Sequence, residues 1–471
     1  MKRISIFLIT IALIAGMVAC GGDPVRYGLT MATSPVGGGT ATDLTDASPY
    51  TAGTRVSIEA VAAAGYYFIN WTSPAGTLGT ETAAATTFTV PTQNVTVTAN
   101  FAMRIPVAEI RTWYDLDAIR NNLAGSYVLV NDLDSTTPGY VGLASPTAND
   151  GEGWQPIGNL TEYYEPTRFE GAFDGQEHQI KDLSINRPDE LAVGLFAVVD
   201  NGGVIKNIGV VDANVTGFYA GLLVGADAGT VVNCYSTGTI SAFLSGGLVG
   251  VVGGTVSDSY SAAGVAGDNW AGGLVGAICG SALACPEWLG VEGTVTNSYA
   301  TGSVSADDEA GGLVGINAGV VSNSYSMGSL SGSDCVGGLV GANWGTVTDS
   351  YSTASVAGNS SVGGLIGYNG DYATVDRSYS VGSVSGSSNV GGLVGYNGGF
   401  NVTCSFWDIQ TSGQLTSDGG IGQNTTQMQD IDTFLGALWD ITAVANPSVR
   451  NLAYIWNIVD DVTYPFLSWQ P

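Results

Sequence analysis

This 471-residue sequence has few histidines and few basic residues. It contains one histidine, His178, and 13 Lys and Arg residues against 41 Asp and Glu, which gives a formal net charge of −28. Nucleic-acid binding needs clustered Lys and Arg to displace counterions from phosphate, so that partner is excluded. An HExxH zinc site needs two histidines on one helix, and a histidine-based triad would rest wholly on His178. These catalytic classes therefore have no support in the sequence.

Long apolar runs are confined to the beginning of the chain. A short basic start, Met1 to Arg3, precedes the apolar stretch 4–19 and then Cys20, a pattern typical of a secretory signal. Residues 17–20, Met-Val-Ala-Cys, resemble the lipobox of bacterial lipoproteins, with Met17 where leucine is usual. The resemblance implies a signal peptide over 1–20, acylation of Cys20, attachment to a membrane through the lipid and a location in the cell envelope. An uncleaved signal anchor is the alternative, although sixteen apolar residues are few for a spanning helix.

Between residues 196 and 406 no stretch has the length or periodicity of a helix. The sequence instead repeats Gly-Gly-Leu-Val-Gly, then Val-x-Asn-Ser-Tyr-Ser, then Gly-Ser-Val-Ser-Gly, at steps of 25 to 28 residues with one step of 39. A fixed period of this length indicates a stacked repeat. The repeat leucine or its equivalent occupies Phe196, Leu223, Leu248, Leu274, Leu313, Leu339, Leu365 and Leu393.

Two further apolar columns run through the repeats. A valine stands four residues before an aromatic in each repeat, as in Val321 and Tyr325, and a third aliphatic such as Leu330 follows five residues later. Each repeat therefore reads as three short strands between tight turns. Strands that match between repeats must stack in parallel about 4.8 Å apart, whereas a β-propeller needs about 40 residues per blade. We therefore expect an all-β protein with a right-handed parallel β-helix, whose valine column, Val321 included, faces inward.

Over residues 194–408 the repeated sequence resembles the GLUG-motif repeats of bacterial surface proteins. This resemblance implies a surface protein of adhesive or non-catalytic kind, with entry coils in 103–193 and a closing cap in 409–471. Residues 27–102, which contain Gly-Tyr-Tyr-Phe-Ile-Asn-Trp, resemble the bacterial surface repeat related to the B-repeat of listerial internalins, a small β module. Residues 21–26 are then a linker.

Both ends of the β-helix are expected to carry caps. Ile110, Trp113, Leu116 and Ile119 recur every three residues, which favours one amphipathic helix over 109–120 that covers the first rung. The aromatic-rich tail after Trp407 is expected to close the other end, with a helix near 428–438.

One repeat carries an insertion with Cys279 and Cys285. In an exported protein these two cysteines are expected to form a small disulfide staple. The acidic loop 307–309 lies near Asp268 and Asp334 by repeat position, which supports the alternative of a carbohydrate-active enzyme or weak binding of divalent cations, although solvated turn charge explains it as well. No cofactor is expected.

The position three residues after the repeat leucine is too variable to be uniformly buried. It ends in Tyr368 and Tyr396 in adjacent coils, with Trp344 one coil earlier, so these rings are expected to stack about 5 Å apart along one edge. Such an edge suits a glycan or a protein ligand. The sequence therefore favours a surface-anchored, non-catalytic binding or adhesive protein, with a polysaccharide-degrading enzyme or a structural spacer as alternatives.

Overall fold

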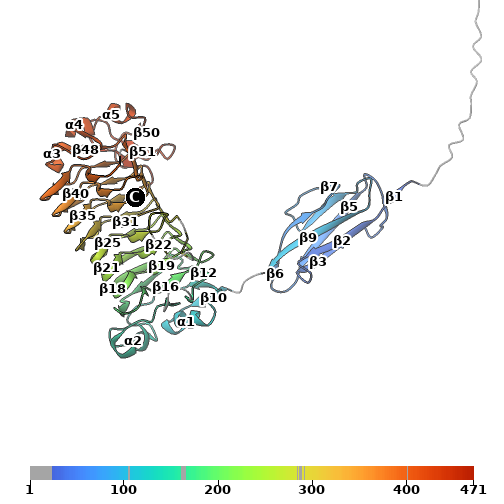
Figure 1. The fold of residues 1–471 in the computed structure, drawn as a ribbon. Helices are drawn as coiled ribbons and strands as arrows, with labels where there is room; N and C mark the ends of the chain where they lie inside the picture. Colours follow the sequence, from blue (N-terminus) through green and yellow to red (C-terminus); the bar gives the residue numbers. More distant parts are fainter. Residues whose placement is uncertain are drawn as a thin grey trace, which may run out of the picture. The chain divides into compact units, whose positions relative to one another are not determined.

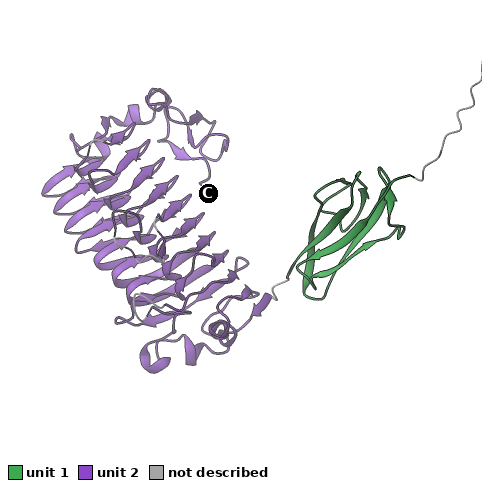
Figure 2. Ribbon diagram, turned by 45° about the vertical axis from the view of Figure 1, so that its right-hand side comes forward, with its two compact units in different colours: residues 1–106 green, residues 107–471 purple. Residues whose placement is uncertain are grey.

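The chain divides into two compact units between residues 106 and 107. The computed structural model describes residues 24–103, 107–160, 166–283, 285, 289–290, 292–399 and 401–470. Figure 2 shows the first unit in green and the second in purple. Cys20 and the apolar stretch before it lie outside the described residues. In the described part of the chain, every helix is too short or too polar to cross a membrane.

The first unit is the small β domain that the sequence predicts. Two sheets, with strand orders β2-β9-β6 and β3-β5-β8-β7, pack around Val56, Ile58, Trp71, Phe88 and Val97, none of which is exposed. The indole Nε1 of Trp71 donates to Ala83 O over 3.0 Å, so this ring is part of the core. The strands are β1 (Arg26–Tyr27), β2 (Leu29–Ser34), β3 (Gly39–Asp43), β4 (Tyr50–Thr51), β5 (Arg55–Ala62), β6 (Tyr66–Thr72), β7 (Thr77–Leu78), β8 (Ala85–Thr89) and β9 (Val95–Met103).

The second unit is a parallel β-helix made of three sheets, as Figure 1 shows. The first sheet has eleven strands, and each pairs in parallel with its equivalent in the next coil. Its strands are β10 (Val107–Ile110), β11 (Ser126–Leu129), β12 (Ala172–Asp174), β17 (Val204–Lys206), β20 (Thr230–Val232), β23 (Thr255–Ser257), β27 (Thr294–Thr296), β32 (Val320–Ser322), β37 (Thr346–Thr348), β42 (Thr374–Asp376) and β47 (Val402–Thr403).

The second sheet has eight strands and is formed by the Leu-Val-Gly segments. Its strands are β16 (Phe196–Val199), β19 (Val224–Asp227), β22 (Val249–Val252), β26 (Val275–Ile278), β31 (Val314–Asn317), β36 (Val340–Asn343), β41 (Ile366–Asn369) and β46 (Val394–Asn397).

The third sheet has 21 strands and joins the tyrosine segments to the segments that precede Gly-Gly-Leu. Its strands are β13 (Gln179–Lys181), β14 (Ser184–Asn186), β15 (Ala192–Val193), β18 (Gly209–Gly221), β21 (Tyr235–Gly246), β24 (Tyr260–Ser261), β25 (Gly264–Gly272), β28 (Tyr299–Ala300), β29 (Val304–Ala306), β30 (Glu309–Gly311), β33 (Tyr325–Ser326), β34 (Ser329–Ser331), β35 (Asp334–Gly337), β38 (Tyr351–Ser352), β39 (Ser355–Ala357), β40 (Ser360–Gly363), β43 (Tyr379–Ser380), β44 (Val384–Ser385), β45 (Ser388–Gly391), β48 (Phe406–Asp408) and β49 (Ile421–Gln423).

The three predicted apolar columns line the interior. Val321 pairs with Val295 on one side and Val347 on the other, and none of these side chains is exposed. The repeat leucines are equally buried, and the third column, with Leu330 at 3% exposure, completes the core. Each aliphatic side chain that is removed from water contributes about 1.5 to 3 kcal/mol before entropy is subtracted, so stability comes from the stack rather than from one repeat.

Asparagine serves two structural functions in the coils. Asn233, Asn297 and Asn323 sit at the corner before the tyrosine with φ of 53°, 47° and 48°, a left-handed conformation that asparagine tolerates better than most residues. Inside the coil, Asn317 Nδ2 donates to Asn343 Oδ1 over 2.8 Å, and the chain of bonds continues to Asn369 and Asn397. These buried amides are thereby satisfied by one another.

The predicted amphipathic helix over 109–120 is wrong at its start. Residues 107–110 form β10, which pairs with β11 as the first strand of the β-helix, and the helix α1 spans only Trp113–Asp117, followed by the 3₁₀ turn η1 (Ala118–Asn121). The reason is a capping box, in which Thr112 Oγ1 accepts from Asp115 N and Asp115 Oδ2 accepts from Thr112 N. Ile110 is buried as expected, but as a strand residue.

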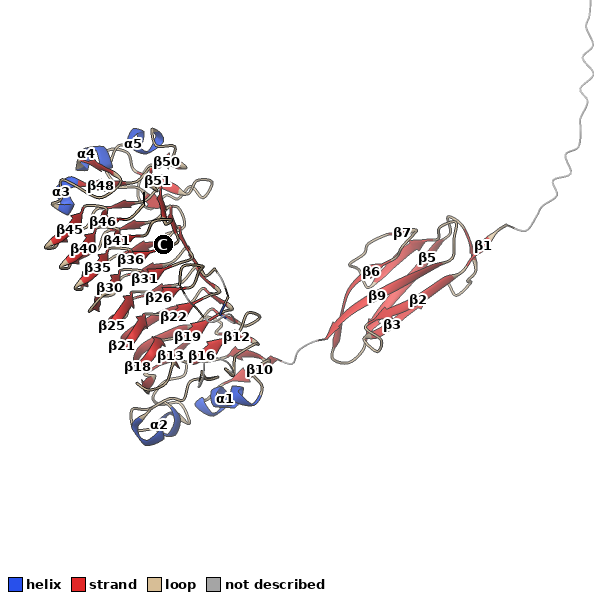
Figure 3. Ribbon diagram, in the orientation of Figure 1, coloured by secondary structure: helices blue, strands red, loops and turns tan. Residues whose placement is uncertain are grey.

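Helices gather at the two ends of this unit, as the blue segments of Figure 3 show. At the first end α1 and η1 lie with α2 (Tyr140–Leu143) and η2 (Asn149–Gly151). At the other end are α3 (Ile409–Ser412), α4 (Thr425–Met428) and α5 (Ile431–Leu435), in place of one helix near 428–438, and a small sheet of β50 (Ile441–Ala443), β51 (Trp456–Ile458) and β52 (Phe466–Leu467).

The C-terminal tail covers part of the lateral face as well as the end. The repeat tyrosines form a ladder of stacked rings with centroids 4.8 to 5.1 Å apart from Tyr235 to Tyr379. Trp456 packs against Tyr351 and Tyr379, and Trp469 reaches Tyr325. The later rungs of the ladder are therefore buried, whereas Tyr235, Tyr260 and Tyr299 stay half-exposed.

Candidate functional site

The aromatic edge, made of Trp344, Tyr368 and Tyr396, lies on the outside of the eight-stranded sheet. Tyr368 and Tyr396 pair across strands β41 and β46, and their ring centroids are 5.4 Å apart at 12°. Trp344 follows β36, and its ring centroid is 5.1 Å from that of Tyr368 at 43°. The structure thus brings the three rings together at the spacing that the sequence predicts.

Two of these rings are open to solvent. Trp344 is 42% exposed and Tyr396 is 41% exposed, whereas Tyr368 is half-buried between them. Because stacked rings cover one another's faces, a ligand meets the ring edges and the outer surfaces of the group. Each of these side chains lies on or next to a paired strand, so the edge is held rigidly before any ligand arrives.

As expected, this column is not uniformly buried, and its non-aromatic members are the buried part. Ala226, Val251, Ala277, Ile316 and Ala342 are at most 8% exposed, yet they face away from the main core. Leu244 and Trp270, from the adjoining sheet, pack against them in a second apolar cluster. Only where the column turns aromatic does it reach the surface.

Acidic residues lie beside the aromatic edge. Glu309 in β30 pairs with Trp270 in β25, and burial raises the pKa of its carboxyl, with repulsion from Asp308 and Asp334 adding to the effect. Burial and the same carboxylates raise the pKa of the Cys335 thiol to about 12, which disfavours the nucleophilic thiolate at neutral pH. Burial, followed by the charge of Asp371, also raises the pKa of Tyr368.

The surroundings of the edge therefore carry negative charge. Asp307 and Asp308 are exposed, and Asp268 is exposed one coil earlier. Among the described residues, three or more His, Cys, Asp or Glu side chains never gather closely enough to hold a metal ion. Weak cation binding by these loops stays a prediction.

The insertion cysteines are bonded to each other in this structure. Cys279 and Cys285 form a disulfide with Cα atoms 5.9 Å apart. Cys279 is fully buried in the second apolar cluster, so the staple ties the insertion to the outside of the eight-stranded sheet.

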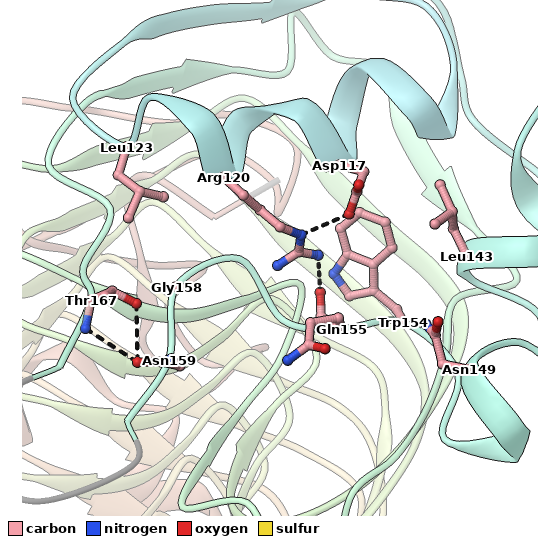
Figure 4. Close-up of a pocket in the computed structure, with 10 residues that line it drawn as sticks. All are labelled: Asp117, Arg120, Leu123, Leu143, Asn149, Trp154, Gln155, Gly158, Asn159 and Thr167. Carbon is pink, nitrogen blue, oxygen red and sulfur yellow. Dashed lines mark hydrogen bonds and ion pairs between the residues drawn. The ribbon is translucent and has the colours of Figure 1, made fainter.

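A cavity at the first end of the β-helix escaped the sequence analysis. It has a volume of about 480 Å³ and, as Figure 4 shows, is bordered by Asp117 and Arg120 above and by Trp154, Gln155 and Asn159 below. Asp117 and Arg120 lie in α1 and η1, and the other residues lie in the polar excursion between β11 and β12. The sequence of this excursion does not repeat, so it did not predict where the excursion lies. The one signal in the sequence was the segment Trp-Gln-Pro-Ile-Gly at 154–158, a tryptophan within a polar excursion.

Comparison with protein families matches a segment of each unit. Residues 29–104 match the divergent InlB B-repeat domain, and residues 332–357 and 358–385 match the GLUG motif. The resemblance of the small β domain to the B-repeat and that of the repeats to the GLUG motif are thereby confirmed, the latter over residues 332–385, whereas the lipobox stays a prediction.

Two curated relatives share part of the chain. It is 37% identical over 137 residues to halomucin of Haloquadratum walsbyi, covering 28% of this chain and 1% of that protein. It is 35% identical over 122 residues to a protein described as "Putative Gly-rich membrane protein" of Evansella cellulosilytica, covering 26% of this chain and 13% of the relative. The chain thus spans a small fraction of the length of the relatives it matches.

Two solved structures align with this chain at low sequence identity and low TM-score. A Bacteroides ovatus protein described as a "putative immunoglobulin A1 protease" aligns with 77% of this chain and 92% of its own length, at 17% identity and a TM-score of 0.39. A second, described as "IgA1 Protease", aligns with 84% of this chain and 28% of its own length, at 14% identity and a TM-score of 0.41. Taken together, the chain is a repeat protein in which a divergent InlB B-repeat domain precedes a parallel β-helix that carries GLUG motifs.

Proposed function

We propose that this chain is a non-catalytic binding or adhesive protein of the bacterial envelope, attached through a lipid on Cys20, that holds its ligand at the aromatic edge. The observation that carries the proposal is the pair of exposed rings, Trp344 and Tyr396, fixed around Tyr368 on adjacent coils. Rigid aromatic side chains offer apolar contact area at small entropic cost. The B-repeat domain then acts as a spacer between the membrane and the β-helix.

The negative charge around the aromatic edge limits the class of ligand that it can bind. Asp371 acts on Tyr368, Asp308 and Glu309 act on Cys335, which itself acts on Tyr368, and the whole chain carries a net charge of −28. Anionic polymers are repelled by such a surface. The ligand we expect is therefore a neutral glycan or a basic segment of a surface protein.

An array of glycans and matrix proteins tests the site. Each ligand bound by the natural protein is measured again with the double variant Tyr368→Ala, Tyr396→Ala, for which we expect affinity to fall by about tenfold or more, the equivalent of ~1.4 kcal/mol. Tyr372→Ala is the matched control, since this tyrosine is 92% exposed in the next turn. Unchanged binding of every ligand by the double variant would remove the edge from consideration.

The location is tested by cell fractionation with protease treatment of intact cells. We expect the protein in the membrane fraction and cleaved by external protease. Recovery in the cytoplasm, or full protection from protease, would contradict a surface role.

A polysaccharide-degrading enzyme is the second candidate, and the raised pKa of Glu309 beside Asp308 is the observation in its favour. A half-buried acid with a raised pKa is the state that a general acid needs. Release of reducing ends or unsaturated products from acidic or neutral polysaccharides, abolished by Glu309→Gln and by Asp308→Ala or Asp307→Ala, would establish this alternative over the first.

A further inference from the structure

We propose that the cavity beneath α1 and η1 is a second binding site, which accepts a neutral saccharide of one or two rings. The cavity has about 480 Å³ and lies at the first end of the β-helix, on coils that precede the GLUG repeats. Volumes of this size are typical of sites for small ligands. The proposal is independent of the aromatic edge.

The walls of the cavity are held in place before a ligand enters. The Arg120 guanidinium lies over the Trp154 ring, 5.0 Å from its centroid, and donates from Nη1 to Pro156 O over 2.6 Å and from Nη2 to Gln155 O. Trp154 is fully buried, and its Nε1 donates to Leu195 O over 3.1 Å. These bonds connect the cap to the first coils, so the cavity keeps its shape.

The charge of the lining favours an uncharged ligand. Among the described residues that line the cavity Arg120 is the one cation, and its Nε donates to Asp117 Oδ1 over 2.7 Å, so the pair is neutral. An adjoining hollow of about 240 Å³ adds Asp189 and Glu190, and Glu190 is paired with Arg187 Nη1 over 2.6 Å. At these described residues an anionic ligand would find no uncompensated positive charge, and would meet the carboxylate of Asp189.

The polar groups of the cavity match hydroxyl groups, which both donate and accept hydrogen bonds. Asn159 Oδ1 accepts from Thr167 N and Oγ1, and Asn149 Nδ2 donates to Gly153 O. Among the bonds of the described residues, the Nδ2 group of Asn159 and the exposed amide of Gln155 stay unengaged, so donors and an acceptor remain for a ligand.

Apolar side chains complete the complementarity. Leu123 and Leu143 border the same cavity and can contact the C–H face of a sugar ring. Gln155 and Asn159 also border the adjoining hollow, so a second ring can extend from one hollow into the other past these amides.

Saturation-transfer NMR and calorimetry with defined sugars test the proposal. The probes are glucose, galactose, mannose, N-acetylglucosamine and their disaccharides, with anionic glucuronic acid as the charged comparator. We expect one or more neutral sugars to bind with a Kd in about the millimolar range, and glucuronic acid to bind more weakly.

Variants locate the binding. Gln155→Ala, at an exposed position, is expected to lower the affinity for the sugar by about tenfold. Leu143→Trp, which fills the cavity, is expected to abolish binding. Tyr396→Ala leaves this binding unchanged, which separates the cavity from the aromatic edge. The proposal is overturned if no neutral sugar binds, if glucuronic acid binds more tightly, or if Gln155→Ala leaves the affinity as it was.

Discussion

Residue 227 is an aspartic acid in a column that holds aliphatic residues or asparagine in other coils. Its Oδ1 accepts from Gly229 N over 3.0 Å, whereas the buried Oδ2 has no partner among the described residues. Asn317 and Asn343 make the same bond, to Gly319 N and Gly345 N. Burial raises the pKa of Asp227 to about 7, so the native state keeps a proton that the unfolded chain loses near pH 4.

The sign of the pH effect follows from this difference. Between about pH 4 and 7 the folded protein binds more protons at this site than the unfolded chain, so the free energy of unfolding falls as pH rises. In the Asp227→Asn variant we expect the free energy of unfolding to fall less as pH rises. Above pH 7 it should exceed that of the natural protein by up to about 4 kcal/mol. Denaturant unfolding at several pH values measures this free energy. The control is Asp212→Asn, because Asp212 is exposed. Parallel pH profiles for the natural protein and Asp227→Asn would show that the carboxyl is not desolvated.

Val321 and Val320 are neighbours that face opposite sides of β32. Val321 is fully buried, whereas Val320 is half-exposed. Val321→Asp places an unpaired charge in the stack and is expected to cost several kcal/mol, with a lower melting temperature, whereas Val320→Asp costs much less. Equal melting temperatures for the two variants would mean that the valine column faces outward.

At the scale of elements, the C-terminal tail closes the β-helix along its side. Trp456 is fully buried, with ring centroids 4.8 Å from Trp439 and 5.8 Å from Tyr379, and its Nε1 donates to Asp349 Oδ1 over 3.3 Å. Arg377 donates to both oxygens of Asp349, from Nε to Oδ1 and from Nη2 to Oδ2, so the tail adds one further hydrogen bond to a carboxylate of the coils. The tail is therefore an integral part of the β-helix.

Removal of this contact tests the closure. Trp456→Ala is expected to destabilise the protein by about 3 to 5 kcal/mol because it leaves a cavity against the tyrosine ladder. Trp344→Ala, at a 42% exposed position of the aromatic edge, is expected to cost under about 1 kcal/mol. Thermal unfolding compares the two, and a cost for Trp456→Ala no larger than that of Trp344→Ala would place the tail outside the cooperative unit.

At the scale of the whole molecule, the predicted lipid on Cys20 decides where the two units work. Two acyl chains are enough for stable membrane attachment, so Cys20→Ala is expected to move the protein from the membrane fraction to the soluble one and to end incorporation of labelled palmitate. Cys234→Ala, in the buried core of the repeats, is the control and keeps the label. Retention of Cys20→Ala in the membrane would point to an uncleaved anchor.

The sequence alone determined the features that repeat. Equivalent residues of successive coils lie one strand spacing apart, about 4.8 Å, so the period of 25 to 28 residues places Val295 beside Val321 and Tyr368 beside Tyr396 without further information. For the same reason the parallel β-helix, its inward columns and the closeness of the rings of the aromatic edge could be predicted. The sequence motifs of each unit were also sufficient to indicate its family.

Only the tertiary structure decided the parts that do not repeat. Ile110 belongs to a strand because β11 offers it a partner, although its spacing fits a helix equally well. Ala277 is buried because Leu244 and Trp270 fold over it from another sheet, and Trp456 reaches Tyr379 from 77 residues away along an aperiodic tail. The cavity at Arg120 and Gln155 arises in the same way, where the cap meets an excursion. Contacts of this kind depend on which surfaces meet in space, and no period in the sequence relates their residues to one another.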